Sequence, residues 1–363
     1  MTAVSLPDNP RILVTRTDRI GDLVVSTPVF SALREAFPKA RIAALVFTEN
    51  RELVEGLPAL DEVILYDKKG SEKGWLGTWR LSRRLAGRFD AVIHLHATNR
   101  MHWLGWLAGI PVRAGWTRKS AWTLTHGLED IKVRGEKHEA LYNFELLRLF
   151  GVEAPESLQP EVPLSARAEA SVRELLFQLE VSGDRPLCVL HPSASCPSKR
   201  WPLSRFAELA AGLHARRPMT LAVIGGPAEA SLGRELAREA GVPVLDLCGR
   251  LSLSALAILL REAAVLISND TGPVHIAAAA GTPVVSIFGR NQPGLSPVRW
   301  RPIGEMTRVV WRDVGCNPCL AHACRIHFLC LDVISAAEVL KELESLGPGI
   351  WEKLPFAAPE RVS

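Results

Sequence analysis

One stretch, residues 268–289, constrains the fold of this chain more than any other. It reads SNDTGPVHIAAAAGTPVVSIFG, and an apolar run of strand length precedes it. Polar residues typical of turns and helix caps come first, and a Gly-Pro pair then opens a short helix of small side chains. Gly281 ends that helix and another apolar strand follows. The pattern predicts a helix that begins directly at the carboxyl end of a strand.

A junction of this kind is suited to binding anions. The unpaired N–H groups and the dipole of the helix both point at its N-terminus and favour phosphate there. In open α/β sheets this is also the edge at which ligands bind. The candidate binding residues at this turn are Asp270, Thr271, Gly272 and His275. The alternative is that Asp270 only caps the helix.

Length and composition indicate an ordinary globular protein of about two domains. The chain has 363 residues, of which 23% are charged and 47% hydrophobic. It contains no apolar run of the roughly 18 residues that a membrane span needs. The first residues, MTAVSLPDNP, lack the pattern of a secretory signal. We therefore expect a cytoplasmic protein whose seven cysteines are reduced.

Short apolar strands alternate with amphipathic helices along most of the chain, which predicts βαβ units and parallel sheets. Residues 151–165 contain three prolines and no periodicity, so they are the expected linker. The predicted fold class is α/β, with two doubly wound, Rossmann-like domains that face each other across a cleft. The expected domains are residues 1–160 and 161–346, followed by a C-terminal tail, residues 347–363. Within them we expect a helix over residues 48–55 and a strand over residues 242–246.

Two polar loops of the second half carry further candidates. The first contains Ser193, Ser195 and Lys199, whose hydroxyl donors and cation suit a diphosphate. Alternatively it is a surface loop with an exposed lysine. The second is glycine-rich but lacks the GxGxxG pattern, which disfavours a nicotinamide dehydrogenase. Its Glu229 either accepts hydrogen bonds from ribose hydroxyls or simply favours a helix dipole.

In the first half, Asp22 follows a buried strand and the loop RTDRIG, at the start of a helical segment that contains Pro28. This places a carboxylate at the ligand-facing edge of the first sheet, although it could equally cap the helix. Pro28 predicts either a kink or a helix that starts late.

Residues 68–119 form a basic segment with eleven Lys and Arg against two acidic residues, Glu72 and Asp90. Six of the ten tryptophans lie in this segment or just after it. Positive charge combined with tryptophan indicates a phosphorylated or membrane-surface partner. No nucleic-acid motif accompanies the charge. The alternative is a solvated basic face with tryptophans in the core.

Four cysteines lie close together near the end of the second half: Cys316, Cys319, Cys324 and Cys330. With two nearby histidines they could hold zinc or an iron–sulfur cluster, but their spacing does not match a standard finger. The alternative is a reduced, partly buried loop.

Three motifs occur together and in order: RTDRIGD at residues 16–22, HP at 191–192 with KRWP at 199–202, and NDTGPVH at 269–275. In these motifs the chain resembles glycosyltransferase family 9, the lipopolysaccharide heptosyltransferases. The resemblance covers roughly residues 11–346.

The resemblance implies a GT-B architecture, with the acceptor in the first domain and the nucleotide sugar in the second. It implies an inverting transfer from ADP-heptose that requires no metal or other cofactor. Asp22 matches the family's base and Lys199 its phosphate ligand. Asp270, Thr271 and Gly272, with His275, match its donor turn, and Glu229 loosely matches an acidic residue at the nucleoside.

The acceptor implied by the resemblance is an anionic, lipid-linked oligosaccharide at the inner face of the cytoplasmic membrane. Its candidate ligands in this chain are Arg19, Arg100, Arg113, Arg118 and Lys119. Three alternatives stay open: a GT-B transferase of another nucleotide sugar, an epimerase of the same fold, and a non-catalytic protein that binds nucleotide or lipopolysaccharide.

Overall fold

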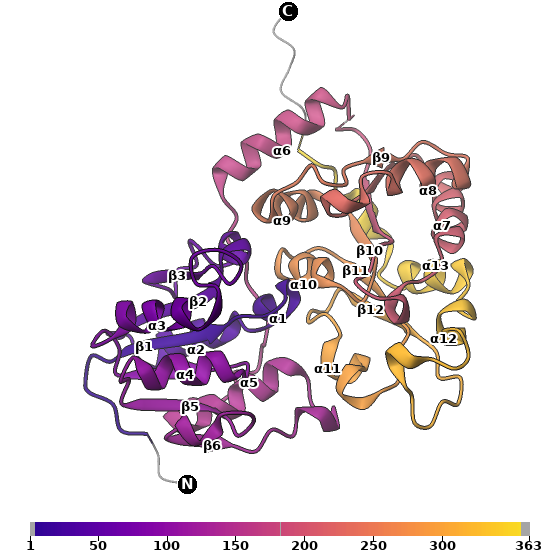
Figure 1. The fold of residues 1–363 in the computed structure, drawn as a ribbon. Helices are drawn as coiled ribbons and strands as arrows, with labels where there is room; N and C mark the ends of the chain where they lie inside the picture. Colours follow the sequence, from indigo (N-terminus) through magenta and orange to yellow (C-terminus); the bar gives the residue numbers. More distant parts are fainter. Residues whose placement is uncertain (1–3, 182, 357–363) are drawn as a thin grey trace, which may run out of the picture. The chain divides into compact units, whose positions relative to one another are not determined.

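The computed structural model describes residues 4–181 and 183–356 (Figure 1). The chain divides into two compact units, an N-terminal and a C-terminal unit, with the division between Pro163 and Leu164. Each unit contains one six-stranded sheet. The expected fold class, two doubly wound α/β units of Rossmann type, is confirmed.

The N-terminal sheet is entirely parallel, and its strands follow the order β3-β2-β1-β4-β5-β6. The strands are β1 (Arg11–Arg16), β2 (Arg41–Phe47), β3 (Glu62–Tyr66), β4 (Ala91–His94), β5 (Val112–Trp116) and β6 (His126–Leu128). The central strands are almost continuously apolar because helices cover both faces of a parallel sheet. On one face, α3 (Gly74–Leu85) and α4 (Asn99–Leu107) pack their leucines against these strands. The remaining helices, α1 (Ile20–Val25), α2 (Pro28–Ala36) and α5 (Glu139–Leu147), contact one another and strands β2 and β5.

The C-terminal sheet is also parallel, with the order β12-β11-β10-β7-β8-β9. Its strands are β7 (Leu187–His191), β8 (Thr220–Val223), β9 (Leu245–Asp246), β10 (Val265–Asn269), β11 (Val284–Phe288) and β12 (Thr307–Trp311). The helices are α6 (Ala166–Gln178), α7 (Leu203–Arg216), α8 (Leu232–Ala240), α9 (Leu253–Glu262), α10 (Gly272–Ala279), α11 (Pro297–Trp300), α12 (Leu329–Asp332) and α13 (Ala336–Glu344). Helices α7, α8 and α13 share one apolar core with the strands, whereas α6 packs on α9.

Both sheets have the same topology, because in each the strand order reverses beside the first strand. The reversal lies between β1 and β4 in the N-terminal unit and between β7 and β10 in the C-terminal unit. Ligands of open α/β sheets bind at this point, beyond the carboxyl ends of the strands. The loops after these four strands are therefore the places to look for a site.

Several elements differ from the sequence-based expectation. The helical segment after Asp22 is two helices, and Pro28 stands in the first turn of the second, where a missing N–H has no cost. The helix expected over residues 48–55 is a 3₁₀ helix (Thr48–Leu53). The strand expected over residues 242–246 is reduced to β9. Helix α6 was not predicted.

The expected C-terminal tail contains a 3₁₀ helix (Pro348–Glu352), and its last part, residues 357–363, lies outside the described residues. None of the helices in the described ranges combines the length and the apolar character that crossing a membrane requires.

Candidate active site

A buried arginine organises the loop that follows β1. The guanidinium of Arg16 binds three carboxylates: its Nε lies 3.0 Å from Asp18 Oδ1, and its terminal nitrogens lie 3.0 Å from Asp22 Oδ1 and 3.1 Å from Glu139 Oε1. The Nζ of Lys132 lies 2.9 Å from the same oxygen of Glu139. Since Glu139 begins α5, the cluster ties the β1 loop to that helix. We call these five residues the Arg16 cluster.

The Arg16 cluster contains three carboxylates and two cations, so with every group ionised it carries one excess negative charge. His96 does not compensate, although its Nδ1 lies 3.3 Å from Asp18 Oδ2, because burial lowers the pKa of His96 to about 4. Burial raises the pKa of Asp18 to about 8, and the attraction of Arg16 only partly opposes this. Burial and the excess negative charge of the cluster therefore both favour the protonated form of Asp18.

Asp22 is the most accessible carboxylate of the Arg16 cluster. Its side chain is 19% exposed, compared with 13% for Asp18 and 1% for Glu139. Asp22 lies in the first turn of α1, where the helix dipole favours a negative charge. The N-cap position belongs to Arg19, and no side-chain cap bond forms there. The interpretation of Asp22 as the helix cap is thus wrong.

In the C-terminal unit, the carboxylate of Asp270 binds two cations instead of capping α10. Its Oδ2 lies 2.9 Å from Lys199 Nζ and 2.8 Å from a terminal nitrogen of Arg290. Lys199 also donates to the backbone carbonyl of Asp270 at 2.9 Å. The N-cap residue of α10 is Thr271. Two cations beside one carboxylate leave a net positive charge at the start of this helix.

Arg290 was not predicted from the sequence. It follows β11, has no motif around it and is only 4% exposed. The one signal for Arg290 in the sequence was its position two residues after β11, the strand that pairs with β10.

The loop that carries Lys199 is fixed to β10 by a single asparagine. Asn269 Oδ1 accepts the backbone N–H of Trp201 at 3.0 Å, and its Nδ2 donates to the carbonyl of Pro192 at 2.8 Å. The buried indole of Trp201 donates to the carbonyl of Ile334 at 2.9 Å. The KRWP and NDTG motifs therefore form one rigid assembly, which explains why both occur in this chain.

His191, at the end of β7, holds the turn before α10 from the other side. Its Nδ1 lies 2.9 Å from Thr271 Oγ1 and 3.2 Å from Ser268 Oγ. Burial lowers the pKa of His191 to about 4, so the ring is neutral and orients these hydroxyls without adding charge.

A small cavity of about 250 Å³ lies next to this assembly, and Glu229 and Ser193 both line it. The hydroxyl of Ser193 donates to Glu229 Oε1, and the N–H of Gly226 donates to Glu229 Oε2 at 2.6 Å. Ser195 is exposed on the same loop, whereas His275 is buried within α10.

The proposed acceptor residues have different roles in the N-terminal unit. Arg19 and Lys119 are exposed, and Arg118 lies 3.6 Å from Asp130. Arg100 donates to the hydroxyl of Tyr66. Arg113 donates to the carbonyls of Thr123 and Ile110, at 2.6 and 2.5 Å, so its guanidinium is used to hold a loop.

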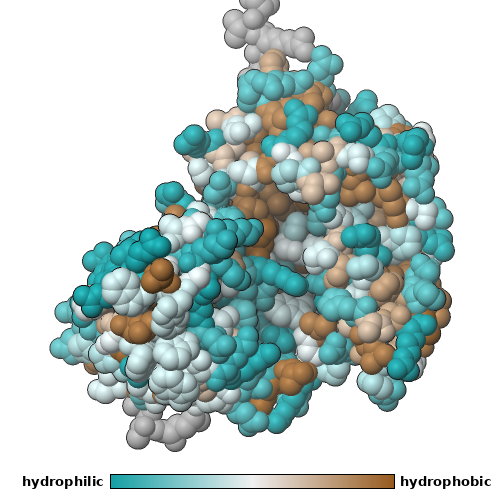
Figure 2. All heavy atoms as spheres, in the orientation of Figure 1, coloured by the Kyte–Doolittle hydropathy of each residue, from teal (hydrophilic) through white to brown (hydrophobic). Residues whose placement is uncertain are grey.

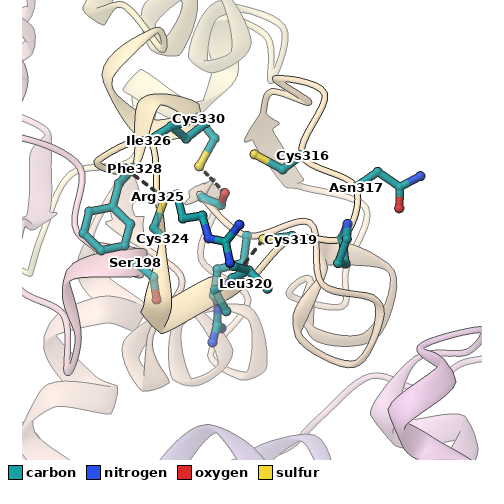
Figure 3. A pocket seen from close by; sticks show the side chains of 14 residues that line it. Ser198, Cys316, Asn317, Cys319, Leu320, Cys324, Arg325, Ile326, Phe328 and Cys330 are labelled. Atoms are coloured by element: carbon teal, nitrogen blue, oxygen red, sulfur yellow. Dashed lines mark hydrogen bonds between the residues drawn. The ribbon is translucent and has the colours of Figure 1, made fainter.

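The four clustered cysteines line one cavity of about 400 Å³, around which their side chains lie (Figure 3). Cys330 donates to the carbonyl of Gly289, and burial raises the pKa of its thiol to about 11. Within residues 4–181 and 183–356, no three Cys, His, Asp or Glu side chains are arranged to hold a metal ion. A bound metal and a reduced, partly buried loop remain the two predictions for these cysteines. Elemental analysis of protein purified without a metal column distinguishes them.

The cysteine segment also supports the Lys199 loop. Ser198, the residue before Lys199, has its hydroxyl 3.0 Å from His322 Nδ1. Ser198 and Arg290 line the same cavity as the cysteines. The segment therefore packs directly behind the donor motifs.

Comparison with known proteins finds relatives that match this chain over most of its length. Lipopolysaccharide heptosyltransferase 2 of Escherichia coli K12 is 26% identical over 360 residues, covering 93% of this chain and 98% of that protein. The crystal structure of a family 9 glycosyltransferase from Veillonella parvula superposes with a TM-score of 0.83 at 24% identity, covering 95% of this chain and 98% of that one. E. coli ADP-heptose lps heptosyltransferase II gives a TM-score of 0.74 at 23% identity, covering 93% and 98%. These structures are of the GT-B class, and the expected GT-B fold of the two units is thereby confirmed.

The sequence model of glycosyltransferase family 9 (heptosyltransferase) matches residues 78–329. The match contains the Lys199 and Asp270 motifs, whereas Asp22 lies before it. Because it covers more than half of the chain, this protein is a glycosyltransferase and belongs to family 9, the heptosyltransferases.

Proposed function

We propose that this enzyme transfers heptose from ADP-heptose to an inner-core lipopolysaccharide acceptor, with inversion at the anomeric carbon and without a metal ion. The carrying observation is the pair of cations, Lys199 and Arg290, held at the start of α10 by Asp270. The names of the relatives support the donor and the acceptor: one is a lipopolysaccharide heptosyltransferase and another an ADP-heptose heptosyltransferase.

The C-terminal unit would bind the donor. Lys199, Arg290 and the first N–H groups of α10 together offer positive potential to a diphosphate, which must gain charge as the sugar leaves. Thr271 and Gly272 form the turn on which the phosphates would lie, with the buried His275 one helical turn behind. Glu229 would accept hydrogen bonds from the ribose, with Ser193 and Ser195 on the neighbouring loop.

The N-terminal unit would bind the acceptor and supply the base. An acceptor hydroxyl must lose its proton as the anomeric carbon becomes oxocarbenium-like. Asp22 is suited to that role because its carboxylate is partly exposed. A terminal nitrogen of Arg16, 3.0 Å from Asp22 Oδ1, keeps the carboxylate oriented. Arg19, Arg118 and Lys119 are exposed cations that an anionic oligosaccharide could contact. We place the enzyme in the cytoplasm, where its nucleotide-sugar donor is available.

The deciding experiment is transfer from ADP-heptose to a panel of truncated lipopolysaccharide acceptors, with wild type and Asp22→Asn. Asparagine keeps an oxygen for Arg16 but cannot take a proton, so turnover should fall by about two to four orders of magnitude while ADP binding stays unchanged. Asp90→Asn, a carboxylate on the same unit that binds Arg11, is the control. Normal turnover in Asp22→Asn rules out this base.

The same assay tests the remaining parts of the proposal. The anomeric configuration of the product, read by NMR, reports inversion or retention. Turnover that survives a chelator supports cation catalysis by Lys199 and Arg290. Transfer from a different nucleotide sugar in preference to ADP-heptose would replace the proposed donor.

A further inference from the structure

The N-terminal unit carries a tryptophan cluster at helices α3 and α4 that the proposed reaction does not use. Trp103 lies at its centre, with ring centroids 5.5 Å from Trp75, 5.5 Å from Trp106 and 5.1 Å from Trp122. All three pairs are edge-to-face, with interplanar angles of 85°, 90° and 88°. Trp79 lies one helical turn after Trp75 on α3. We call these five residues the tryptophan cluster.

Most of the tryptophan cluster faces solvent. The exposed fractions are 64% for Trp122, 56% for Trp75, 50% for Trp79 and 43% for Trp106, and the neighbouring Leu76 is 70% exposed. Tryptophan is nearly neutral on the scale of Figure 2, where pale and brown residues gather over the part of the unit in which Figure 1 shows α3 and α4. Large apolar side chains that are exposed together in this way are typical of an interaction site.

Helix α3 shows why these side chains are not part of the core. Its buried residues are Gly77, Thr78, Leu81, Ser82 and Leu85, which form one face at helical spacing. The exposed residues of the helix include Trp75, Leu76 and Trp79, which lie on the outer face together with Arg80 and Arg83. An outer face that combines indole rings with arginines is typical of a helix that lies in a membrane interface.

The indole N–H groups point to the same environment. Trp103 donates to Ser120 Oγ at 2.9 Å. Within residues 4–181 and 183–356, the indole N–H groups of the four exposed tryptophans donate no hydrogen bond. An apolar ring with a free donor is favoured at the level of lipid headgroups and carbonyls.

The charge around the tryptophan cluster is positive. Of the two acidic residues in residues 68–119, Glu72 is buried against Arg84 at 2.9 Å and Asp90 binds Arg11 at 2.6 Å. Exposed cations border the cluster along α3: Lys73, Arg80 and Arg83. Cations beside an apolar surface are attracted to anionic lipid headgroups.

We propose that the tryptophan cluster is a docking surface for an anionic lipid bilayer. The exposed indoles would enter the interface, and the bordering cations would contact headgroup phosphates. Attachment would be peripheral, because no helix of the described residues can span a bilayer. The inference goes beyond the proposed function, since neither donor nor acceptor takes part in it.

The test is co-sedimentation of the full-length enzyme with phosphatidylcholine vesicles, with and without phosphatidylglycerol. We expect binding only to the anionic vesicles. The triple variant Trp75→Ala, Trp79→Ala, Trp122→Ala should bind them at least about tenfold more weakly, because the apolar area that enters the interface is removed. The control is Val298→Ala with Leu354→Ala, two exposed apolar residues of the C-terminal unit that are 51% and 49% exposed.

A second arm removes charge and keeps the tryptophans. Arg80→Gln with Arg83→Gln should weaken binding at low salt by about fivefold for each cation. Brominated lipid should quench part of the tryptophan fluorescence in wild type but far less in the triple variant. If the triple variant does not fold, the single variant Trp122→Ala is tested instead, because Trp122 is the most exposed tryptophan of the cluster.

Two results would overturn the proposal. One is unchanged vesicle binding in the triple variant. The other is a concentration-dependent dimer of the wild type that the triple variant loses, which would make the cluster an interface between two copies of the chain. Transfer to a delipidated, water-soluble acceptor is measured separately, so a failure of docking is distinguishable from a failure of the proposed reaction.

Discussion

The raised pKa of Asp18 in the Arg16 cluster should make stability depend on pH in a direction opposite to that of most carboxylates. The perturbation that isolates it is Asp18→Asn, which resembles the protonated acid in shape and charge. Asp18 is the group to change because burial raises its pKa to about 8, whereas an aspartate in an unfolded chain has a pKa of about 3.9.

The magnitude follows from proton linkage. Between pH 5 and 7 the native chain holds a proton on Asp18 that the unfolded chain has released. The stabilisation from Asp18 is fully present below about pH 4 and is lost as pH rises towards about 8. The free energy of unfolding should therefore fall by about 1.4 kcal/mol per pH unit, or about 2.7 kcal/mol from pH 5 to 7, through this residue alone. Asp18→Asn has no such contribution.

The assay is urea unfolding of wild type and Asp18→Asn at pH 5, 6 and 7, followed by tryptophan fluorescence. Six of the ten tryptophans lie in the N-terminal unit, so the signal mainly reports its unfolding. The pH dependence from titratable groups that both proteins share cancels in the comparison. The free energy of unfolding of Asp18→Asn should therefore increase steadily relative to that of wild type as pH rises. If both proteins change by the same amount between pH 5 and 7, the proton does not reside on Asp18 and our charge count is wrong.

Asp90→Asn is the matched control for this experiment. Its hydrogen bond to Arg11 lowers the pKa of Asp90. The carboxylate is therefore ionised in both the folded and the unfolded chain between pH 5 and 7. Its removal should lower stability by an amount that does not vary across this range, because stability from Asp90 is lost only at lower pH.

Two further predictions concern the donor motifs. Lys199→Met removes a charge-assisted contact worth about 1.5–3 kcal/mol, so the Kd of ADP measured by calorimetry should rise about 10- to 150-fold. The control is Lys341→Met, on the exposed side of α13. An unchanged Kd in Lys199→Met would show that Lys199 does not contact the donor. Trp201→Phe leaves the buried carbonyl of Ile334 without its hydrogen-bond donor, so the free energy of unfolding in urea should fall by about 1–3 kcal/mol. Trp351→Phe, at a partly buried residue, should lower it less. Equal decreases would mean that the hydrogen bond of Trp201 contributes nothing to stability.

The donor motifs were predictable because their geometry is local. The run from β10 through Asp270 to Gly281 contains its own strand, turn and helix stop, so the order of residues specifies the shape. The reversal of the strand order next to β1 and β7 also follows from the alternation of strands and helices. In contrast, the lengths of the 3₁₀ helix Thr48–Leu53 and of β9 depend on packing against the rest of each sheet, and propensity alone overestimated both.

The distant contacts of Arg16 and Asp270 could not be predicted, because they come from other parts of the chain. Glu139 meets Arg16 across more than 100 residues, and Arg290 reaches Asp270 from the loop after the neighbouring strand. No periodicity records such contacts.

The sequence by itself determined the fold class, the family motifs and the presence of a basic, tryptophan-rich segment. The tertiary structure decided the burial that raises the pKa of Asp18, the two cations on Asp270 and the exposure of the tryptophans. The physical reason is that pKa and accessibility depend on which charges and surfaces converge in space, and convergence is set by how the sheet and its helices pack.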